Sequence, residues 1–371
     1  MHTALRFVVA MSGGVDSSVV AGLLANEGYD LSAVFMRNWD TRDESGTDSG
    51  CEWKKDWQDV QKVCSLLDIP YQMVDLSREY WTRVFDPSLR AWEAGATPNP
   101  DIWCNKEVKF GALLQKIIPQ DTWLATGHYA RKSWTATSTG TRPQLLRPSD
   151  RTKDQTYYLS SIPEQSLARS IFPLAQLQKS EVREHASKWG LPTAERAESM
   201  GICFVGEKRR FDDFISQYIT PRPGAIIDHI TGEALGTYEA MWTFTIGQGA
   251  KIRGMPQKMF VSGKDPKKNE IYVVPGSDHP LLYKSRIYAQ DWKWIWGDSP
   301  PVAIDGVDGF RARVQFRHRM MDVGCIVKRG DKEGSIIIEL DEPQKAVAPG
   351  QVAAIWDQNW CLGCGVIEGA E

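Results

Sequence analysis

The stretch Met11-Ser12-Gly13-Gly14-Val15-Asp16-Ser17-Ser18 decides the fold of this chain. It follows an apolar run, Leu5 to Ala10, and precedes a segment in which Val15, Val19 and Leu23 share one helical face. This order predicts a strand, a glycine turn and the start of a helix. Paired glycines let a ligand approach the backbone, and the free N–H groups of a helix start favour an anion. The stretch therefore predicts a phosphate-binding loop.

The loop is not a Walker A loop, because that pattern needs a lysine and none lies here. Its form, Ser-Gly-Gly-x-Asp-Ser, resembles the loop of the N-type ATP pyrophosphatases. The resemblance implies that the loop holds the terminal phosphates of ATP and that the products are an adenylated substrate and pyrophosphate. Asp16 is then a candidate ligand of Mg²⁺, which prefers carboxylate and phosphate oxygens. A plain tight turn with serine caps is the alternative interpretation.

Short apolar runs and helical stretches alternate after this loop. Leu31 to Phe35, Tyr71 to Val74 and Trp123 to Thr126 are typical of buried strands. One helical face between them carries Trp57, Val60, Cys64 and Leu67. The alternation predicts an α/β fold with a doubly wound parallel sheet, which binds ligands at the carboxyl ends of its strands. The resemblance of the Ser12 loop implies a sheet of the adenine nucleotide α-hydrolase type. Met36 and Gly127-His128-Tyr129 follow two of those ends.

The sequence pattern changes near residue 205. Before it, Asp40 to Cys51 and Ser133 to Arg142 are predicted loops, and Ser180 is a candidate cap for a last helix. After it, Met241 to Ile246 alternates like a strand. Strand patterns then dominate in Phe310 to Phe316, Gly324 to Val327, Ser335 to Leu340 and Val352 to Trp356. We expect a catalytic domain over 1–205, a small central domain over 206–284 and a C-terminal β-barrel, or a sandwich, over 285–371.

Composition and charge narrow the class of protein. The 371 residues are 42% hydrophobic and 25% charged, as in a globular protein of several domains. No apolar run approaches the roughly 18 residues of a membrane span, so no membrane partner is expected. The net charge is −3, yet residues 251–330 carry 15 Lys/Arg against 8 Asp/Glu. Such a local basic excess can bind a phosphate backbone.

Seven cysteines occur, and two of them lie in motifs. An odd number without framework spacing indicates a reducing compartment. Cys104 lies in Thr97-Pro-Asn-Pro-Asp-Ile-Trp-Cys-Asn-Lys106, where two prolines stiffen the chain, Lys106 and Lys109 favour a thiolate and Asp101 opposes one. Cys203 lies in Ser199-Met-Gly-Ile-Cys-Phe-Val-Gly206. By spacing alone, each is either a catalytic thiol or an inert buried cysteine.

In combination, these motifs resemble the tRNA-specific 2-thiouridylase family. The resemblance rests on the Ser12 loop, Pro-Asn-Pro-Asp-Ile-x-Cys-Asn-Lys, Gly127-His128-Tyr129, Lys153-Asp154-Gln155 and Gly201-Ile-Cys-Phe204, in this order. It spans Ser12 to Gln351, nearly the whole chain. The forms Glu198-Ser-Met-Gly201 and Arg37-Asn-Trp-Asp40 are more similar to mitochondrial eukaryotic members than to bacterial ones.

The resemblance implies a two-stage reaction on the wobble uridine, position 34, of tRNA. ATP adenylates O2 of the base, and sulfur then replaces that oxygen at C2. Cys203 would carry the sulfur as a persulfide, Cys104 would attack that persulfide or resolve the resulting disulfide, and Asp101 would act as acid and base. Because a disulfide needs close Cα atoms, we expect the segment around Cys203 to move and to become ordered by tRNA.

Further positions carry over from the family one at a time. Nucleotide-binding positions are Ala10, Met11, Ser12, Gly13, Gly14, Val15, Asp16, Ser17, Met36 and Gly127. Positions that meet tRNA are Asn99, Pro100, Asp101, His128, Lys153, Asp154, Gln155, Arg317, His318 and Gln351. Additional candidate phosphate contacts are Lys208, Arg209, Arg210, Arg311, Arg313 and Arg319. The family's cation after Gly247-Gln248 is missing here, and Lys251 or Arg253 is a candidate substitute.

The implied cofactors are ATP and Mg²⁺, with no metal held by the protein alone. The implied partners are the Lys, Glu and Gln tRNAs and a persulfide-donating sulfur carrier or cysteine desulfurase. Because the first strand is expected almost at Met1, we expect no transit peptide within this chain. The resemblance to eukaryotic members favours the mitochondrial matrix, and a bacterial-type cytoplasm is the other expectation.

Two other classes of protein stay open at the level of sequence. One is an ATP pyrophosphatase that amidates or ligates a small molecule, which needs no paired cysteines. The other is a catalytically dead tRNA-binding module, against which the intact loop and both motif cysteines argue. Cys361 and Cys364 have the spacing of half a metal site, but no second pair of similar spacing exists.

Overall fold

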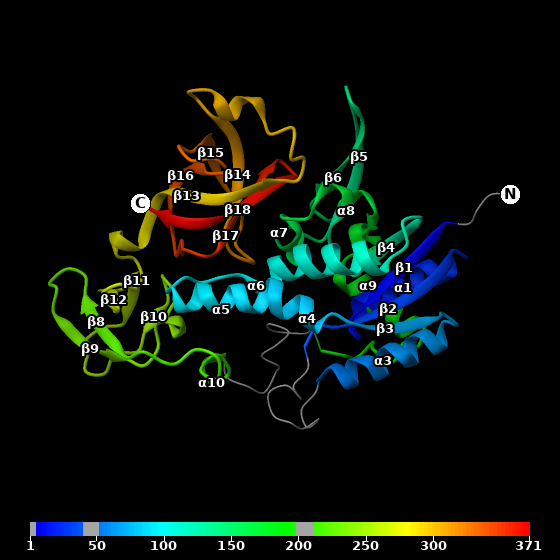
Figure 1. The fold of residues 1–371 in the computed structure, drawn as a ribbon, viewed down its shortest axis with the longest axis horizontal. Helices are drawn as coiled ribbons and strands as arrows, with labels where there is room; N and C mark the ends of the chain where they lie inside the picture. The colour runs from blue at the N-terminus through cyan, green and yellow to red at the C-terminus, as the bar shows by residue number, and fades with distance from the viewer. Residues whose placement is uncertain (1–4, 40–51, 198–210) are drawn as a thin grey trace. The chain divides into compact units, whose positions relative to one another are not determined.

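The structure, a computed structural model, describes residues 5–39, 52–197 and 211–371. The chain separates into two compact units (Figure 1). The first contains Met1–Val84, Asp101–Glu207 and Asn359–Cys361, and the second contains Phe85–Pro100, Lys208–Gln358 and Leu362–Glu371. The division passes between Pro100 and Asp101, inside the proline-rich motif. Within the described ranges, no helix is both long enough and apolar enough to cross a bilayer.

A parallel sheet organises the first unit. Its strands are β1 (Arg6–Met11), β2 (Asp30–Arg37), β3 (Tyr71–Asp75), β4 (Thr122–Thr126) and β7 (Ser170–Ile171), in the order β3-β2-β1-β4-β7. Their register is parallel throughout, which confirms the predicted fold class. The predicted burial of the Tyr71 strand is wrong. β3 has a single neighbour at the edge of the sheet, and most of its residues are exposed.

Apolar side chains on both faces of β1 are buried. Phe7, Val9 and Met11 share one core with residues of α1 (Val15–Asn26), α3 (Glu52–Leu66) and α9 (Lys179–Lys188). Val8 and Ala10 point to the opposite face and are buried as well. The remaining helical segments that begin in this unit are α4 (Ser77–Tyr80), η1 (Trp81–Phe85), η2 (Cys104–Ile117), η3 (Arg151–Lys153), α7 (Thr156–Leu159), α8 (Glu164–Ala168) and η4 (Pro173–Gln176).

Two further predictions for the first unit are wrong. The presumed loop from Ser133 to Arg142 is a β-hairpin of β5 (Arg131–Thr137) and β6 (Gly140–Leu146), because Thr and Trp side chains suit paired strands. Ser180 does not cap α9. Gln178 occupies the cap and forms a capping box with Glu181. The predicted loop from Asp40 to Cys51 lies outside the described residues.

The second unit contains a small sheet and a barrel. The sheet has the order β10-β11-β12-β8-β9 and a core that includes Val261, Ile271 and Val273. Its elements are β8 (Gly224–Asp228), β9 (Ala234–Tyr238), β10 (Gly249–Ala250), β11 (Met259–Asp265) and β12 (Glu270–Pro275), with α5 (Asp86–Glu93), α10 (Phe211–Ile215) and η5 (Met241–Thr243). The strand predicted over Met241 to Ile246 is wrong, since its first half is the 3₁₀ turn η5.

A closed ring of strands forms the barrel. Neighbouring strands run β13-β16-β15-β14-β17-β18, and β13 also pairs with β18, which closes the ring. The bounds are β13 (Tyr283–Trp294), β14 (Phe310–Gln315), β15 (Val323–Arg329), β16 (Ile336–Lys345), β17 (Val352–Asp357) and β18 (Trp360–Ala370), with 3₁₀ turns η6 (Pro280–Leu282) and η7 (Val302–Asp305). The barrel expectation is therefore confirmed over the sandwich, because closure leaves this ring no free edge.

Candidate functional site

The Ser12 loop connects β1 to α1 and has the predicted backbone shape. Gly13 has φ +78°, a conformation that side chains rarely adopt. A Cβ on Gly13 would lie 2.8 Å from the carbonyl oxygen of Asp56, so no larger residue fits. Gly14 precedes the first turn of α1, whose backbone N–H groups are the anion-binding feature of the loop.

The serines of the loop have unequal roles. Ser17 and Ser18 are buried, and their hydroxyls donate to the carbonyl oxygen of Gly14 at 3.1 and 2.9 Å. Ser17 Oγ also accepts from the backbone N–H of Ser12 at 3.1 Å. Ser12 itself is exposed. Ser17 and Ser18 therefore hold the loop in shape, and the exposed Ser12 adds hydrogen bonds of its hydroxyl with Ser17 Oγ at 3.2 Å and with the Gly14 N–H at 3.4 Å.

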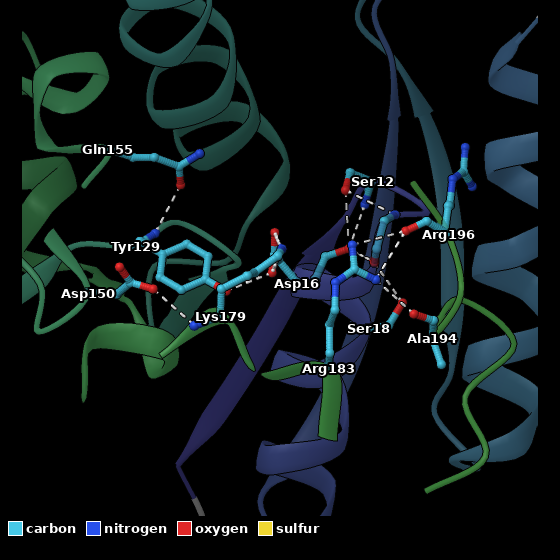
Figure 2. Close-up of polar contacts among 12 residues, drawn as sticks. Ser12, Asp16, Ser18, Tyr129, Asp150, Gln155, Lys179, Arg183, Ala194 and Arg196 are labelled. Carbon is cyan, nitrogen blue, oxygen red and sulfur yellow. Dashed lines mark hydrogen bonds and ion pairs between the residues drawn. The ribbon is translucent and has the colours of Figure 1, made fainter. Parts of the chain in front are cut away.

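Asp16 is the centre of a polar cluster that the sequence did not reveal. Lys179 donates to both of its carboxylate oxygens, at 2.6 and 2.8 Å, and the hydroxyl of Tyr129 donates at 3.0 Å. Figure 2 shows Lys179 and Tyr129 converging on Asp16 from separate segments. One signal could have revealed Lys179. It is the first residue of α9, where a cation is disfavoured by the helix dipole, so its place there suggests another role.

Gly127 brings the end of β4 against the loop. A Cβ on Gly127 would lie 2.8 Å from the backbone nitrogen of Ser17 and 3.2 Å from the Cβ of Asp16. Met36 lies near the carboxyl end of β2, the strand beside β1. Ala10, Met11 and Val15 are buried in the sheet and helix core, so they can meet a nucleotide only through their backbone. The fold thus assembles the predicted nucleotide positions at one edge.

Arg196 also braces the loop and was not predicted. Its guanidinium donates to the carbonyl oxygen of Gly13 at 2.8 Å and to Asp59 at 2.7 Å, and it forms an ion pair with Asp56. Arg183 in turn donates to the backbone oxygen of Ala194 at 3.0 Å (Figure 2). Arg196 therefore ties the chain that leads to residue 197 onto the loop and α3, and Arg183 ties that chain to α9.

Asp101 lies in the short helix α6 (Pro100–Trp103), and Cys104 is the first residue of η2, the wide π-helix that follows it. Cys104 is 6% exposed, and Asp101 is half-buried. Burial raises the pKa of the Asp101 carboxyl above its ordinary value, although the Lys109 ammonium opposes the shift. Lys106, expected to favour a thiolate at Cys104, forms an ion pair with Glu107 at 3.0 Å. Its charge is therefore largely offset.

His128 is held in one neutral tautomer. Lys109 Nζ lies 3.4 Å from Nε2, and because an ammonium only donates, Nε2 accepts. Nδ1–H then donates to the hydroxyl of Thr126 at 2.8 Å. Burial, with the Lys109 charge beside it, holds the pKa of His128 well below its ordinary value. His128 can therefore accept or donate hydrogen bonds beside Lys109, but it carries no charge at neutral pH.

Two residues of the Lys153-Asp154-Gln155 segment have structural contacts. The Asp154 carboxylate accepts from Arg147 at 2.6 Å and from the backbone of Thr156 at 2.9 Å. Gln155 Oε1 accepts from the backbone N–H of Tyr129 at 3.0 Å, directly beside the Asp16 cluster. The contacts of Asp154 and Gln155 therefore hold the segment that carries Lys153 in place.

In the second unit, Gln351 holds the segment that leads to Asn99 and Pro100. Its side-chain amide donates to the carbonyl oxygen of Thr97 at 2.8 Å, and the backbone of Thr97 donates to Pro349 at 2.8 Å. The other two expected tRNA positions of this unit follow β14. The guanidinium of Arg317 lies 5.5 Å from the ring of Phe316, and His318 is exposed in the turn after it.

The additional basic residues fare differently. Arg311 and Arg313 form ion pairs with Asp341 and Asp322 at 2.6 and 2.7 Å, so their charge is offset on the strand face. Lys251 and Arg253 are exposed. Lys208, Arg209, Arg210 and the motif cysteine Cys203 lie outside the described residues. The pairing of Cys104 with Cys203 therefore stays a prediction.

The remaining described cysteines are all buried. Cys361 and Cys364 are buried free thiols, and the described ranges contain no group of three or more His, Cys, Asp or Glu residues placed to hold a metal. Burial raises the pKa of the Cys64 thiol to about 11 and that of Cys325 to about 12. Both stay protonated at neutral pH.

Comparisons with known proteins cover the chain nearly end to end. Residues 5–207 match the family model described as "tRNA methyl transferase HUP domain", 212–275 the "tRNA methyl transferase PRC-barrel domain" and 284–367 the "Aminomethyltransferase beta-barrel domain". A protein of Levilactobacillus brevis named "tRNA-specific 2-thiouridylase MnmA" is 41% identical over 100% of this chain and 96% of its own length. Proteins of the same name from Bacillus licheniformis and Chromohalobacter salexigens are 42% and 40% identical over 98% of this chain, covering 95% and 93% of their own lengths.

Proposed function

Because the chain belongs to the tRNA-specific 2-thiouridylase family, we propose that it catalyses ATP-dependent 2-thiolation of the wobble uridine of tRNA. The observation that carries the proposal is the Ser12 loop, folded tightly between β1 and α1, in a chain that aligns with such enzymes over its full length. The family models have methyltransferase descriptions, but a loop suited to ATP phosphates favours adenylation instead.

The loop residues fit ATP and Mg²⁺. Gly13 and Gly127 leave no room for a Cβ and so let backbone atoms come close to phosphate oxygens. Asp16 supplies the carboxylate that Mg²⁺ prefers, and Lys179 would pass from Asp16 to a phosphate oxygen when the metal binds. When bound, ATP and its metal supply the adenylation of O2 of the base.

We further propose that sulfur arrives as a persulfide on Cys203. The outer sulfur bonds to C2 of the base, and the C2–O bond breaks to release AMP. The thiolate of Cys104 attacks the inner sulfur, the S–S bond breaks, and a disulfide between the two cysteines remains. A dithiol reductant then restores both thiols. Asp101, whose pKa is raised by burial, is suited to move a proton at the base.

Substrate set, sulfur source and organisation are parts of the same proposal. The Lys, Glu and Gln tRNAs are the expected substrates, and a persulfide carrier or cysteine desulfurase the expected donor. We also propose that the chain has the three domains 1–205, 206–284 and 285–371.

The relatives are bacterial and give no support to a special likeness to mitochondrial members, to a mitochondrial location or to a stable disulfide. The bacterial relatives favour the other expected location, a bacterial-type cytoplasm, over the mitochondrial matrix.

The test is reconstitution with purified protein, ATP, Mg²⁺, an unmodified tRNA and a cysteine desulfurase with cysteine. Mass spectrometry of the digested tRNA should reveal 2-thiouridine at position 34, together with pyrophosphate release that needs tRNA. Pyrophosphate release with a small acid or amine in place of tRNA would support the synthetase alternative. No pyrophosphate release with any substrate would support a dead binding module.

A further inference from the structure

Three arginines line a pocket in the first unit. None of the predicted site residues is among the residues that line it. The pocket has a volume of about 210 Å³ and is lined by Arg131, Arg147, Pro148, Ser149, Arg151 and Asn359. We call it the arginine pocket. Arg131 begins β5 and faces Leu146 across the hairpin, so Arg131 and Arg147 meet at its base. Arg151 opens the turn η3, which leads directly into Lys153-Asp154-Gln155.

An ion pair and hydrogen bonds hold Arg147 and Arg151 in place in the arginine pocket. The Arg147 side chain is 5% exposed and donates to Asp154 at 2.6 Å. Arg151 donates to the side-chain oxygen of Asn359 at 2.8 Å, while the backbone of Arg147 donates to the Asn359 carbonyl oxygen at 3.0 Å. None of the lining residues is acidic. Asp154 forms an ion pair with one of the three arginines, Arg147.

Arg131 adds an unsatisfied donor. Its Nε is buried and has no hydrogen-bond partner within the described part of the chain. Guanidinium groups match the geometry of phosphate oxygens and bind them in a bidentate manner. The lining offers no aromatic side chain for a base to stack on, so the chemistry favours a phosphate group over a nucleobase.

We propose that the arginine pocket binds a backbone phosphate of the tRNA substrate. This inference rests on the proposed function and adds to it a tRNA-binding position on the first unit. The pocket volume is about seven times the liquid volume of one water, roughly 30 Å³, so a phosphate with its flanking oxygens fits. Its role is to anchor the substrate, so it should contribute to binding and not to the chemical steps.

The test measures tRNA affinity as a function of salt for Arg131→Gln and Arg151→Gln. A variant that no longer holds the phosphate should bind tRNA several-fold more weakly, and its slope of log K against log salt should be lower by about 0.7 to 0.9. The KM for ATP and the thiolation rate at saturating tRNA should stay at the wild-type value. Arg147 is left intact, because its removal would strand the buried Asp154 carboxylate.

Arg6→Gln is the matched control, since Arg6 is an exposed arginine of the same unit at the start of β1. It should keep the wild-type slope. Pocket variants with an unchanged slope, or with a loss of thermal stability but wild-type tRNA affinity, would overturn the proposal. Inorganic phosphate that raises the melting temperature of the wild type as much as tRNA does, but does not raise that of Arg131→Gln, would assign the pocket to a free anion instead. A wild type that binds tRNA but makes no 2-thiouridine would count against the proposed function and not against the pocket.

Discussion

The ion pair between Lys179 and Asp16 joins residues 163 positions apart. Asp16 is also the proposed ligand of Mg²⁺. A hydrogen bond to a charged group contributes roughly 1.5–3 kcal/mol. If Lys179 passes to a phosphate during adenylation, Lys179→Met should lower kcat/KM for ATP by about tenfold or more, since each 1.36 kcal/mol is a factor of ten. Lys179→Arg should retain part of the activity. A coupled assay of pyrophosphate release measures the effect.

Lys188→Met is the control for that prediction, because Lys188 is an exposed lysine at the other end of α9. It should leave the ATP kinetics unchanged. A Lys179→Met protein that only melts at a lower temperature, with wild-type kinetics, would show that the lysine merely neutralises Asp16.

The raised pKa of Asp101 makes a prediction about pH and stability. A carboxyl whose folded pKa exceeds its unfolded pKa stabilises the fold while protonated, and that contribution is lost as pH rises through the folded pKa. Asp101→Asn stays neutral at every pH. The free energy of unfolding of the wild type should therefore fall relative to the variant as pH rises above the ordinary carboxyl value near 4.

Urea denaturation of both proteins across pH 4 to 8 measures that difference. The variant should also lose thiolation activity, because it can no longer exchange a proton. A stability difference that stays constant with pH would mean that Asp101 titrates normally and is not tuned for proton transfer.

At the scale of elements, the π-helix η2 presents Cys104 at its first position. A Cβ on Gly111 would lie 2.7 Å from the carbonyl oxygen of Lys106, five residues earlier, so the wide turn requires glycine here. Gly111→Ala should force the helix to shift and should destabilise the protein by about 1–3 kcal/mol, as overpacking does. Chemical denaturation measures the loss, and the alkylation rate of Cys104 reports the displacement of the thiol.

Gly369→Ala is the matched control, since a Cβ there meets nothing within 4 Å. It should keep wild-type stability and alkylation. Wild-type behaviour of Gly111→Ala would indicate that η2 accommodates a side chain and that its width has no bearing on Cys104.

At the scale of the whole molecule, the two stages of the proposed reaction use different side chains. Adenylation depends on the Ser12 loop, and sulfur transfer depends on the motif cysteines. Cys104→Ser should therefore still release pyrophosphate with tRNA but should form no 2-thiouridine. Cys64→Ala, which removes a buried and protonated thiol in α3, should keep both activities apart from a modest loss of stability. Parallel assays of pyrophosphate and 2-thiouridine separate the two stages.

Equal loss of both activities in a folded Cys104→Ser protein would instead indicate that the thiol acts during adenylation. Full thiolation by that variant would remove the thiol from the mechanism and favour the small-molecule synthetase.

Predictions from sequence succeeded where a pattern is local. The Ser12 loop, the strands of the parallel sheet and the strands of the barrel follow from residue periodicity and turn chemistry within short windows. Predictions failed where the structure of a segment depends on its neighbours in space. β3 has the composition of a buried strand but lies at a sheet edge, and the Ser133 segment has the composition of a loop but pairs as a hairpin.

The sequence by itself determined the order of motifs and the class of fold, and it supplied the candidate residues for ATP and sulfur chemistry. Only the tertiary structure decided that Lys179 and Tyr129 meet at Asp16, that Gly127 packs against the loop, that His128 stays neutral and that three arginines share a pocket. The physical reason is distance along the chain. Local patterns set backbone conformation within a few residues, whereas burial and charge pairing depend on which distant segments the sheet brings together.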